Sequence, residues 1–285
     1  MDRRDFVKTL GLIGVSALPS ASLNAEDVNE GKEFVGLLVD TTRCVGCQSC
    51  TEACAEANNL PEPDLDAIDE GKERNTTEKQ WTLVNRFEVD GEEIFVKKQC
   101  MHCNQPACAA ACPTSALLKT KEGPVIWRED KCMGCRFCMV SCPFEMPKFE
   151  YDSPIPKIQK CRMCFERLQG GDVPACAAEC PEEAITFGNR RELIDEARSR
   201  IYTNPDDYVH QIYGEHEVGG TGYIYLASVP HEKLGMRADL GNTPYPEYTK
   251  TFLYSVPIVL TLWPAFLLAM NNATKRDGDQ TEGEV

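Results

Sequence analysis

The segment Cys132-Met-Gly-Cys135-Arg-Phe-Cys138-Met-Val-Ser-Cys142-Pro143 decides the fold. Three cysteines separated by two residues each allow one tight loop to reach three corners of a 4Fe-4S cubane. The last cysteine lies four residues further along the chain, and the proline after it fixes the backbone that leaves the ligand. The spacing therefore predicts a loop that binds an iron-sulfur cluster.

This grouping occurs four times and uses all sixteen cysteines of the 285 residues. Two groups share the spacing C-x-x-C-x-x-C-x-x-x-C, and the other two widen the middle gap to four and eleven residues. In chain order the groups are motif one (Cys44, Cys47, Cys50 and Cys54), motif two (Cys100, Cys103, Cys108 and Cys112), motif three (Cys132, Cys135, Cys138 and Cys142) and motif four (Cys161, Cys164, Cys176 and Cys180). We predict that all sixteen bind metal, in four 4Fe-4S clusters.

Two other uses of the thiols compete with this interpretation. Disulfides do not require four repeats of one loop spacing. Structural zinc prefers two separated C-x-x-C pairs, which motif four alone offers, whereas motifs one and three place three thiols within seven residues. The repeated spacing favours iron-sulfur clusters.

The linkers between motifs predict how the motifs pair. In bacterial two-cluster ferredoxins the last cysteine of each motif binds the cluster of its partner. Residues 117–127 contain two short extended runs around Gly123, typical of the hairpin inside one ferredoxin unit. Residues 143–160 carry four prolines, which favours an extended crossover over a hairpin. We therefore pair motif two with motif three and, by elimination, motif one with motif four. The exchanged ligands are then Cys54 to motif four, Cys180 to motif one, Cys112 to motif three and Cys142 to motif two.

The expected fold class is α+β, with two bacterial-ferredoxin-like modules over residues 34–188. Residues 81–89 and 92–98 alternate around Asp90-Gly91, which predicts an inserted β-hairpin. A C-terminal extension over residues 189–250 begins with a helix that Asn189 is expected to cap and contains a strand-like run over 223–229.

The N-terminus carries Arg3 and Arg4, then a weakly apolar run and small residues up to Ala25. This pattern predicts a twin-arginine signal peptide over residues 1–25. Export of a protein already folded around its cofactors would protect the thiols in an oxidising compartment. The alternative is an amphipathic or disordered N-terminus that carries two chance arginines.

An uncharged run of 19 residues, 252–270, lies near the C-terminus. As a helix it is about 28 Å long, close to the hydrocarbon thickness of a bilayer. Lys275 and Arg276 follow it, so a single transmembrane anchor with a cytoplasmic tail over 271–285 is expected. Pro257 and Pro264 are tolerated in a bilayer where neighbouring groups satisfy the freed carbonyls. The alternative is a buried core helix.

The formal net charge of −15 argues against nucleic acid as a partner. His102, inside motif two, either tunes the potential of the cluster, couples a proton to electron transfer, or has a structural role. His210, His216 and His231 lack metal-ligand spacing, and no catalytic arrangement stands out. The chain is therefore predicted not to be an enzyme by itself.

The motifs resemble those of the four-cluster iron-sulfur subunits of membrane-associated oxidoreductases, the family of formate dehydrogenase N, dimethyl sulfoxide reductase and polysulfide reductase. Gln99-Cys-Met-His-Cys103, residues 212–221 and Val229-Pro230 are similar to the hydrogenase-2-type branch of nickel-iron uptake hydrogenases. This resemblance implies two ferredoxin modules with four clusters in a row, at the periplasmic face of the cytoplasmic membrane. It further implies electron transfer between a nickel-iron hydrogenase catalytic subunit and a quinone-reactive integral membrane subunit.

Three alternatives to the hydrogenase interpretation stay open. The chain would play the same role beside a molybdopterin oxidoreductase, such as formate dehydrogenase or a sulfur-compound reductase. It would otherwise be an autonomous electron carrier or a zinc-stabilised scaffold.

Overall fold

A computed structural model describes residues 34–68 and 73–281 of the chain. The predicted signal peptide over residues 1–25 lies outside the described residues, and so does the end of the predicted tail, residues 282–285. All sixteen cysteines lie within the described ranges.

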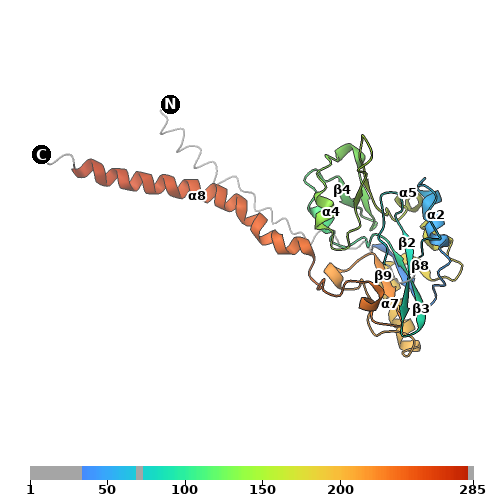
Figure 1. The fold of residues 1–285 in the computed structure, drawn as a ribbon. Helices are drawn as coiled ribbons and strands as arrows, with labels where there is room; N and C mark the ends of the chain where they lie inside the picture. Colours follow the sequence, from blue (N-terminus) through green and yellow to red (C-terminus); the bar gives the residue numbers. More distant parts are fainter. Residues whose placement is uncertain (1–33, 69–72, 282–285) are drawn as a thin grey trace. The chain divides into compact units, whose positions relative to one another are not determined.

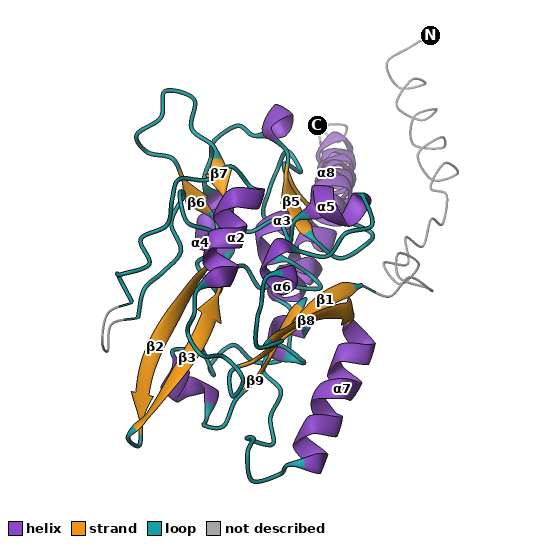
Figure 2. Cartoon of the chain, turned by 90° about the vertical axis from the view of Figure 1, so that its right-hand side faces the viewer, coloured by secondary structure: helices purple, strands orange, loops and turns teal. Residues whose placement is uncertain are grey.

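A three-stranded sheet joins segments that are far apart in the sequence (Figure 2). Strand β1 (Val35–Asp40) pairs antiparallel with β8 (Ile185–Asn189) and parallel with β9 (Tyr223–Leu226). Both faces of β1 are buried, which explains why its sequence is almost continuously apolar. The C-terminal extension thus contributes strand β9 to the same sheet as β1, the first strand of the described chain.

Helix α7 (Arg190–Thr203) covers one face of this sheet. Its Leu193, Ile194 and Ala197 pack with side chains of β1 and β9, at the spacing of an amphipathic helix. Asn189 occupies the N-cap position, but its side chain makes no capping hydrogen bond. The Arg190 N–H instead donates to the Phe34 carbonyl, 2.8 Å away, so the expected cap is correct in position only.

The opposite face of the sheet, with Leu37, Val39, Tyr223 and Tyr225, packs against the cysteine-bearing loops. Strands β2 (Leu83–Val89) and β3 (Glu92–Lys98) form an antiparallel hairpin that joins the same core through their inward side chains. Asp90 and Gly91 at its tip have φ values of 55° and 88°, as a two-residue turn of this kind requires. The hairpin therefore closes the core on the side of the thiols.

Two shorter ladders lie beside motif three. Strands β4 (Leu117–Lys119) and β5 (Val125–Trp127) form the hairpin expected between motifs two and three. Strands β6 (Lys148–Phe149) and β7 (Ile158–Gln159) are also antiparallel, so the extended crossover expected over 143–160 is wrong. Pro154 and Pro156 lie in the connecting loop, where no ladder N–H is needed, so the prolines do not prevent a hairpin.

Short helices carry or flank the cysteines. They are α2 (Ser49–Ala57), α3 (Ala107–Ala110), α4 (Phe137–Ser141), α5 (Phe165–Gln169) and α6 (Ala175–Ala178). Three 3-10 turns, η1 (Glu129–Lys131), η2 (Glu217–Gly219) and η3 (His231–Leu234), complete the connections among the described residues. Helix α2 packs beside α6, and α3 packs beside α4.

The long helix α8 (Tyr245–Thr281) contains the predicted anchor (Figure 1). Its residues 245–272 form the one helix of the described chain that is long and apolar enough to cross a membrane. No part of this segment is buried against the rest of the described chain. Within the described chain this segment is therefore not a buried core helix, and its apolar side chains are exposed.

Candidate iron-sulfur sites

None of the sixteen cysteines forms a disulfide. Within residues 34–68 and 73–281, no three His, Cys, Asp or Glu side chains are arranged to hold a single metal ion. A tetrahedral zinc site with bonds of about 2.3 Å would bring thiolate sulfurs within roughly 3.8 Å of one another.

Motifs one and three share one backbone conformation. Gly46 and Gly134 have φ values of 72° and 71°, and Gln48 and Arg136 have values of 61° and 59°. Helices α2 and α4 begin at the residue after Gln48 and after Arg136. Each loop therefore wraps its first cysteines and then turns abruptly into a helix that carries the last ones.

Gly46 and Gly134 differ in the space around the position of a Cβ atom. A Cβ on Gly46 would lie 2.5 Å from the Phe95 ring, whereas at Gly134 the nearest atom, in Phe149, is 3.9 Å away. The left-handed φ is the shared requirement. Close packing against β3 adds a second requirement at Gly46 only.

Motifs two and four form a second matching pair. Both contain Pro-Ala-Cys-Ala-Ala, at residues 106–110 and 174–178, and in both the proline precedes a short helix whose second residue is a ligand candidate. Helix α5 occupies the eleven-residue gap of motif four. This repeated pentapeptide was visible in the sequence and is a stronger sign of duplication than the gap lengths.

The structure brings the thiols together in four sets, each with three cysteines from one motif and one from another. Cys54 lies among Cys161, Cys164 and Cys176, and these four line one cavity. Cys112 lies among Cys132, Cys135 and Cys138, and these four line another. Cys142 lies beside Cys100, Cys103 and Cys108. Cys180 lies beside Cys44 of motif one.

Burial dominates the acidity of these thiols. It raises the pKa of Cys50 and Cys161 to about 12 and that of Cys138 and Cys142 to about 11. Cys112 differs: its slight burial would raise the pKa, but donors at residues 114–117, among them the Ala116 N–H at 3.1 Å from Sγ, lower it. Without metal most thiols in these sets hold their protons at neutral pH, and metal binding must release them.

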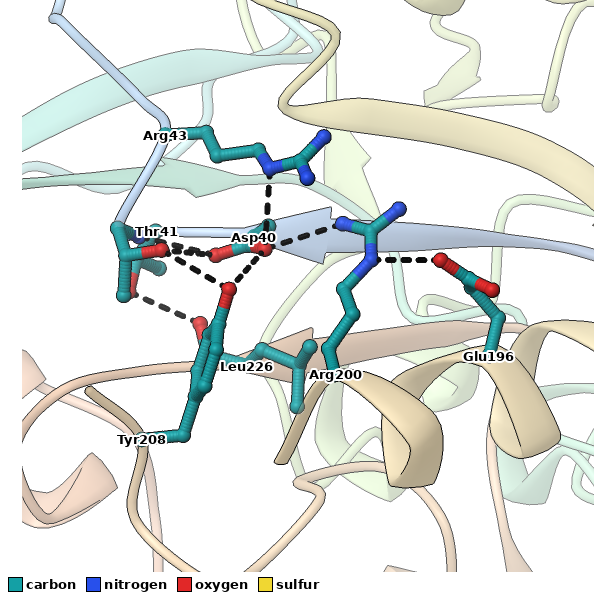
Figure 3. Close-up of polar contacts among 8 residues, drawn as sticks. Asp40, Thr41, Arg43, Glu196, Arg200, Tyr208 and Leu226 are labelled. Atoms are coloured by element: carbon teal, nitrogen blue, oxygen red, sulfur yellow. Dashed lines mark hydrogen bonds and ion pairs between the residues drawn. The ribbon is translucent and has the colours of Figure 1, made fainter. Parts of the chain in front are cut away.

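Buried Asp40 ends strand β1 four residues before Cys44 and anchors the start of motif one. Its carboxylate accepts hydrogen bonds from the Thr42 hydroxyl at 2.6 Å and the Thr42 N–H at 3.1 Å. It also accepts from the Tyr208 hydroxyl at 2.9 Å and the Arg200 guanidinium at 3.0 Å (Figure 3). The C-terminal extension, through these two residues, thus fixes the path into the first loop. Sequence reasoning missed this network, because its partners are 160 and 168 residues from Asp40.

His102 has a structural contact. Its Nδ1 accepts the Val125 N–H at 2.8 Å, so the neutral ring carries its proton on Nε2. Complete burial, with Lys160 and two other lysines nearby, lowers the pKa of His102 well below its ordinary value. The ring therefore stays neutral and ties motif two to β5. His231 stacks on Tyr213 with ring centroids 5.4 Å apart.

The four thiol sets are typical of an iron-sulfur protein. The family model of the 4Fe-4S dicluster domain matches residues 92–190. A protein of Nitratidesulfovibrio vulgaris is 43% identical, over 97% of this chain and 78% of that protein. Hydrogenase-2 operon protein HybA of Escherichia coli O157:H7 is 34% identical over 97% of both chains. The iron-sulfur subunit of nitrate-inducible formate dehydrogenase of E. coli K12 is 32% identical over 70% of both.

The chain belongs to the family of 4Fe-4S proteins that contains HybA and the formate dehydrogenase iron-sulfur subunits. This confirms the resemblance drawn from the motifs, and 4Fe-4S clusters are its cofactors.

Proposed function

We propose that the chain is the electron-transfer subunit of a membrane-bound periplasmic respiratory complex, between a hydrogenase catalytic subunit and a quinone-reactive integral membrane subunit. The grouping of sixteen thiols into four mixed sets, in a member of this family, carries the proposal. The chain itself is not the catalytic subunit. Each cluster, when bound, accepts and releases one electron.

Each thiol set would hold one 4Fe-4S cluster. The proposed ligands are Cys44, Cys47, Cys50 and Cys180 for cluster one; Cys100, Cys103, Cys108 and Cys142 for cluster two; Cys112, Cys132, Cys135 and Cys138 for cluster three; and Cys54, Cys161, Cys164 and Cys176 for cluster four. The α2–α6 and α3–α4 contacts support two ferredoxin-like modules within residues 34–188, with the β2–β3 hairpin as an insert. Residues 189–250 would be an extension that braces the first module.

Clusters one and three would exchange electrons with the partner subunits. Among the sixteen thiols, only those of Cys47 and Cys135 belong to exposed residues. Exposed apolar side chains lie in the same loops, Val45 in motif one and Met133, Phe137 and Val140 in motif three. Partner subunits that covered these loops would bring their own redox groups close to a cluster and exclude water.

Helix α8 would be a single transmembrane anchor over residues 252–270. Its exposed apolar surface and its length support insertion into the lipid bilayer. Lys275 and Arg276 after the span, and the twin arginines near the N-terminus, support a cytoplasmic tail and an exported body. Pro257 and Pro264 within the helix support contact with a membrane partner that satisfies the freed carbonyls.

A second candidate is the same role for a molybdopterin oxidoreductase, because formate dehydrogenase subunits are also relatives. The alignment with HybA covers 97% of both chains, and that with the formate dehydrogenase subunit of E. coli K12 covers 70% of both. The longer alignment therefore favours the hydrogenase partner.

The test is anaerobic purification of the native complex through an affinity tag on this chain, followed by nickel and molybdenum analysis. We expect a partner that contains nickel. Molybdenum without nickel would select the second candidate. A monomer with neither metal, able to exchange electrons with several donors, would favour an autonomous carrier instead.

A further inference from the structure

Three lysines lie in the interior between the thiol sets. Lys97 and Lys160 are buried, and Lys119 is half-buried. Among the described residues, none of their ammonium groups has a carboxylate oxygen within 4.0 Å. Buried charges are normally paired, so these lysines require an explanation.

The three lysines differ in the acceptors around them. The Lys160 ammonium donates to the carbonyls of Val125 and Cys161, and that of Lys119 donates to the His102 carbonyl at 2.9 Å. The Lys97 ammonium donates to the side-chain oxygen of Gln99 at 2.7 Å. Lys97 and Lys119 thus have one acceptor each, and of these two only Lys97 is fully buried.

Lys97 is also held firmly in place. The Gln99 amide donates to the Tyr225 hydroxyl, and that hydroxyl donates to the Lys97 carbonyl at 2.9 Å. The ammonium lies 5.2 Å from the centre of the Tyr223 ring, whose hydroxyl is 3.9 Å from the Cys176 sulfur. This closed network fixes the charge at one point of the core.

That point lies between motifs one and four. The thiols that interact most strongly with Lys97 are those of Cys176, Cys50 and Cys161. Lys97 also lines the cavity of Cys54, Cys161, Cys164 and Cys176. Cys50 belongs to the ligands proposed for cluster one, and the other thiols to those proposed for cluster four. One buried cation thus faces two proposed cluster sites.

We propose that Lys97 is the shared internal counter-charge of clusters one and four and raises the reduction potential of both. This inference rests on the proposed ligand sets. Four thiolates outweigh the positive charge of an iron-sulfide core, so a ligated cluster is anionic, and its net charge helps to set its potential. Reduction adds one electron and one more negative charge, while Lys97 keeps its proton. A fixed positive charge in a region of low dielectric therefore favours the reduced state.

The test uses the full chain, purified anaerobically, with Lys97→Met, Lys97→Gln and Lys97→Arg. Iron content is measured first, and midpoint potentials then come from redox titration followed by electron paramagnetic resonance. We expect the Met and Gln variants to lose about tenfold or more in the equilibrium constant for reduction of two clusters. For a one-electron couple that is a downward shift of about 59 mV or more. The Arg variant should stay near the wild-type potentials.

The matched control is Lys98→Met. Lys98 is the next residue of β3, and its ammonium pairs with Glu73 instead of facing the thiols. Its substitution should leave all four potentials unchanged. Equal potentials in the Lys97→Met, Lys98→Met and wild-type proteins would overturn the inference.

Iron content separates the remaining outcomes. If the Met and Gln variants lose iron and the Arg variant retains it, the positive charge is required and the inference stands. Loss of iron in the Arg variant as well would contradict it. Wild-type protein without 4Fe-4S signals would refute the proposed ligand sets, whereas wild-type signals with unshifted variants would refute the role of Lys97 alone.

Discussion

Asp40→Asn is the substitution whose effect follows most directly from the structure. It keeps the shape of the side chain but removes the charge that Arg200 and the Tyr208 hydroxyl meet at 3.0 and 2.9 Å. A hydrogen bond to a charged group contributes about 1.5–3 kcal/mol, and breaking a buried ion pair costs about 3–5 kcal/mol. Arg200 keeps a second partner, Glu196, and its side chain is 13% exposed. We therefore expect the free energy of unfolding to fall by about 2–3 kcal/mol, no more than the low end of the range for a buried ion pair.

For a chain of this size, each kcal/mol corresponds to about 2–4 °C, so the apparent Tm should fall by roughly 4–12 °C. The assay is thermal denaturation of anaerobically purified protein, followed by circular dichroism and by the visible absorbance of the clusters. All variants need one scan rate, because unfolding of a cofactor protein is commonly irreversible. Because Asp40 fixes the path to Cys44, cluster absorbance should also be lost at lower temperature.

Arg198→Gln is the matched control on the same helix. The Arg198 side chain is 59% exposed and pairs with the exposed Asp195 and with Glu215, whose side chain is 13% exposed. An exposed pair contributes about 0–1 kcal/mol, so the control should move the apparent Tm by roughly 0–4 °C. An Asp40→Asn protein that melts together with wild type would refute the reasoning that this carboxylate fixes the first loop.

Three further predictions follow from the same structure. Gly46→Ala should reduce iron content and apparent Tm more than Gly134→Ala, because only the first adds a clash with Phe95 to the cost of the left-handed φ; equal losses would contradict this. A chain that ends at Pro244 should leave the membrane fraction and keep its iron, and its retention in washed membranes would argue against α8 as the anchor. Burial raises the pKa of Cys50 and Cys161 to about 12, so protons compete with iron for these thiols, and chelators should remove iron faster at about pH 6 than at about pH 8. A rate independent of pH would count against that competition.

Local sequence patterns predicted several elements of the fold. The alternation around Asp90-Gly91 matches β2 and β3, and the Gly123 turn matches the β4–β5 hairpin, because a two-residue period and turn chemistry are local properties. The apolar run 252–270 lies inside α8 for the same reason. The spacing of the cysteines predicted the cysteine-bearing loops, because a loop that wraps a cluster is short and its pattern is local.

Long-range pairing was not visible in the sequence. Strand β1 lies between β8 and β9, about 150 and 190 residues later, and nothing in its own residues selects those partners. The β6–β7 ladder is only two residues long, which is too short for a periodic signal beside four prolines. Lys97 looked like an ordinary strand lysine, and only the packed core shows that it faces Cys50 and Cys176.

The pairing of motif one with motif four was predicted by elimination, and one premise of that elimination was the wrong crossover. In the structure the β6–β7 hairpin and the grouping of Cys54 with Cys161 occur together. The pairing therefore rests on the observed positions of the thiols and not on the shape of the linker.

We propose that this chain holds four 4Fe-4S clusters. The most direct measurement is the iron and acid-labile sulfide content of the anaerobically purified full chain, together with electron paramagnetic resonance of the dithionite-reduced protein. We expect about sixteen iron and sixteen sulfide atoms per chain, with the spectrum of interacting 4Fe-4S clusters. About eight iron atoms, or zinc in place of iron, would contradict it.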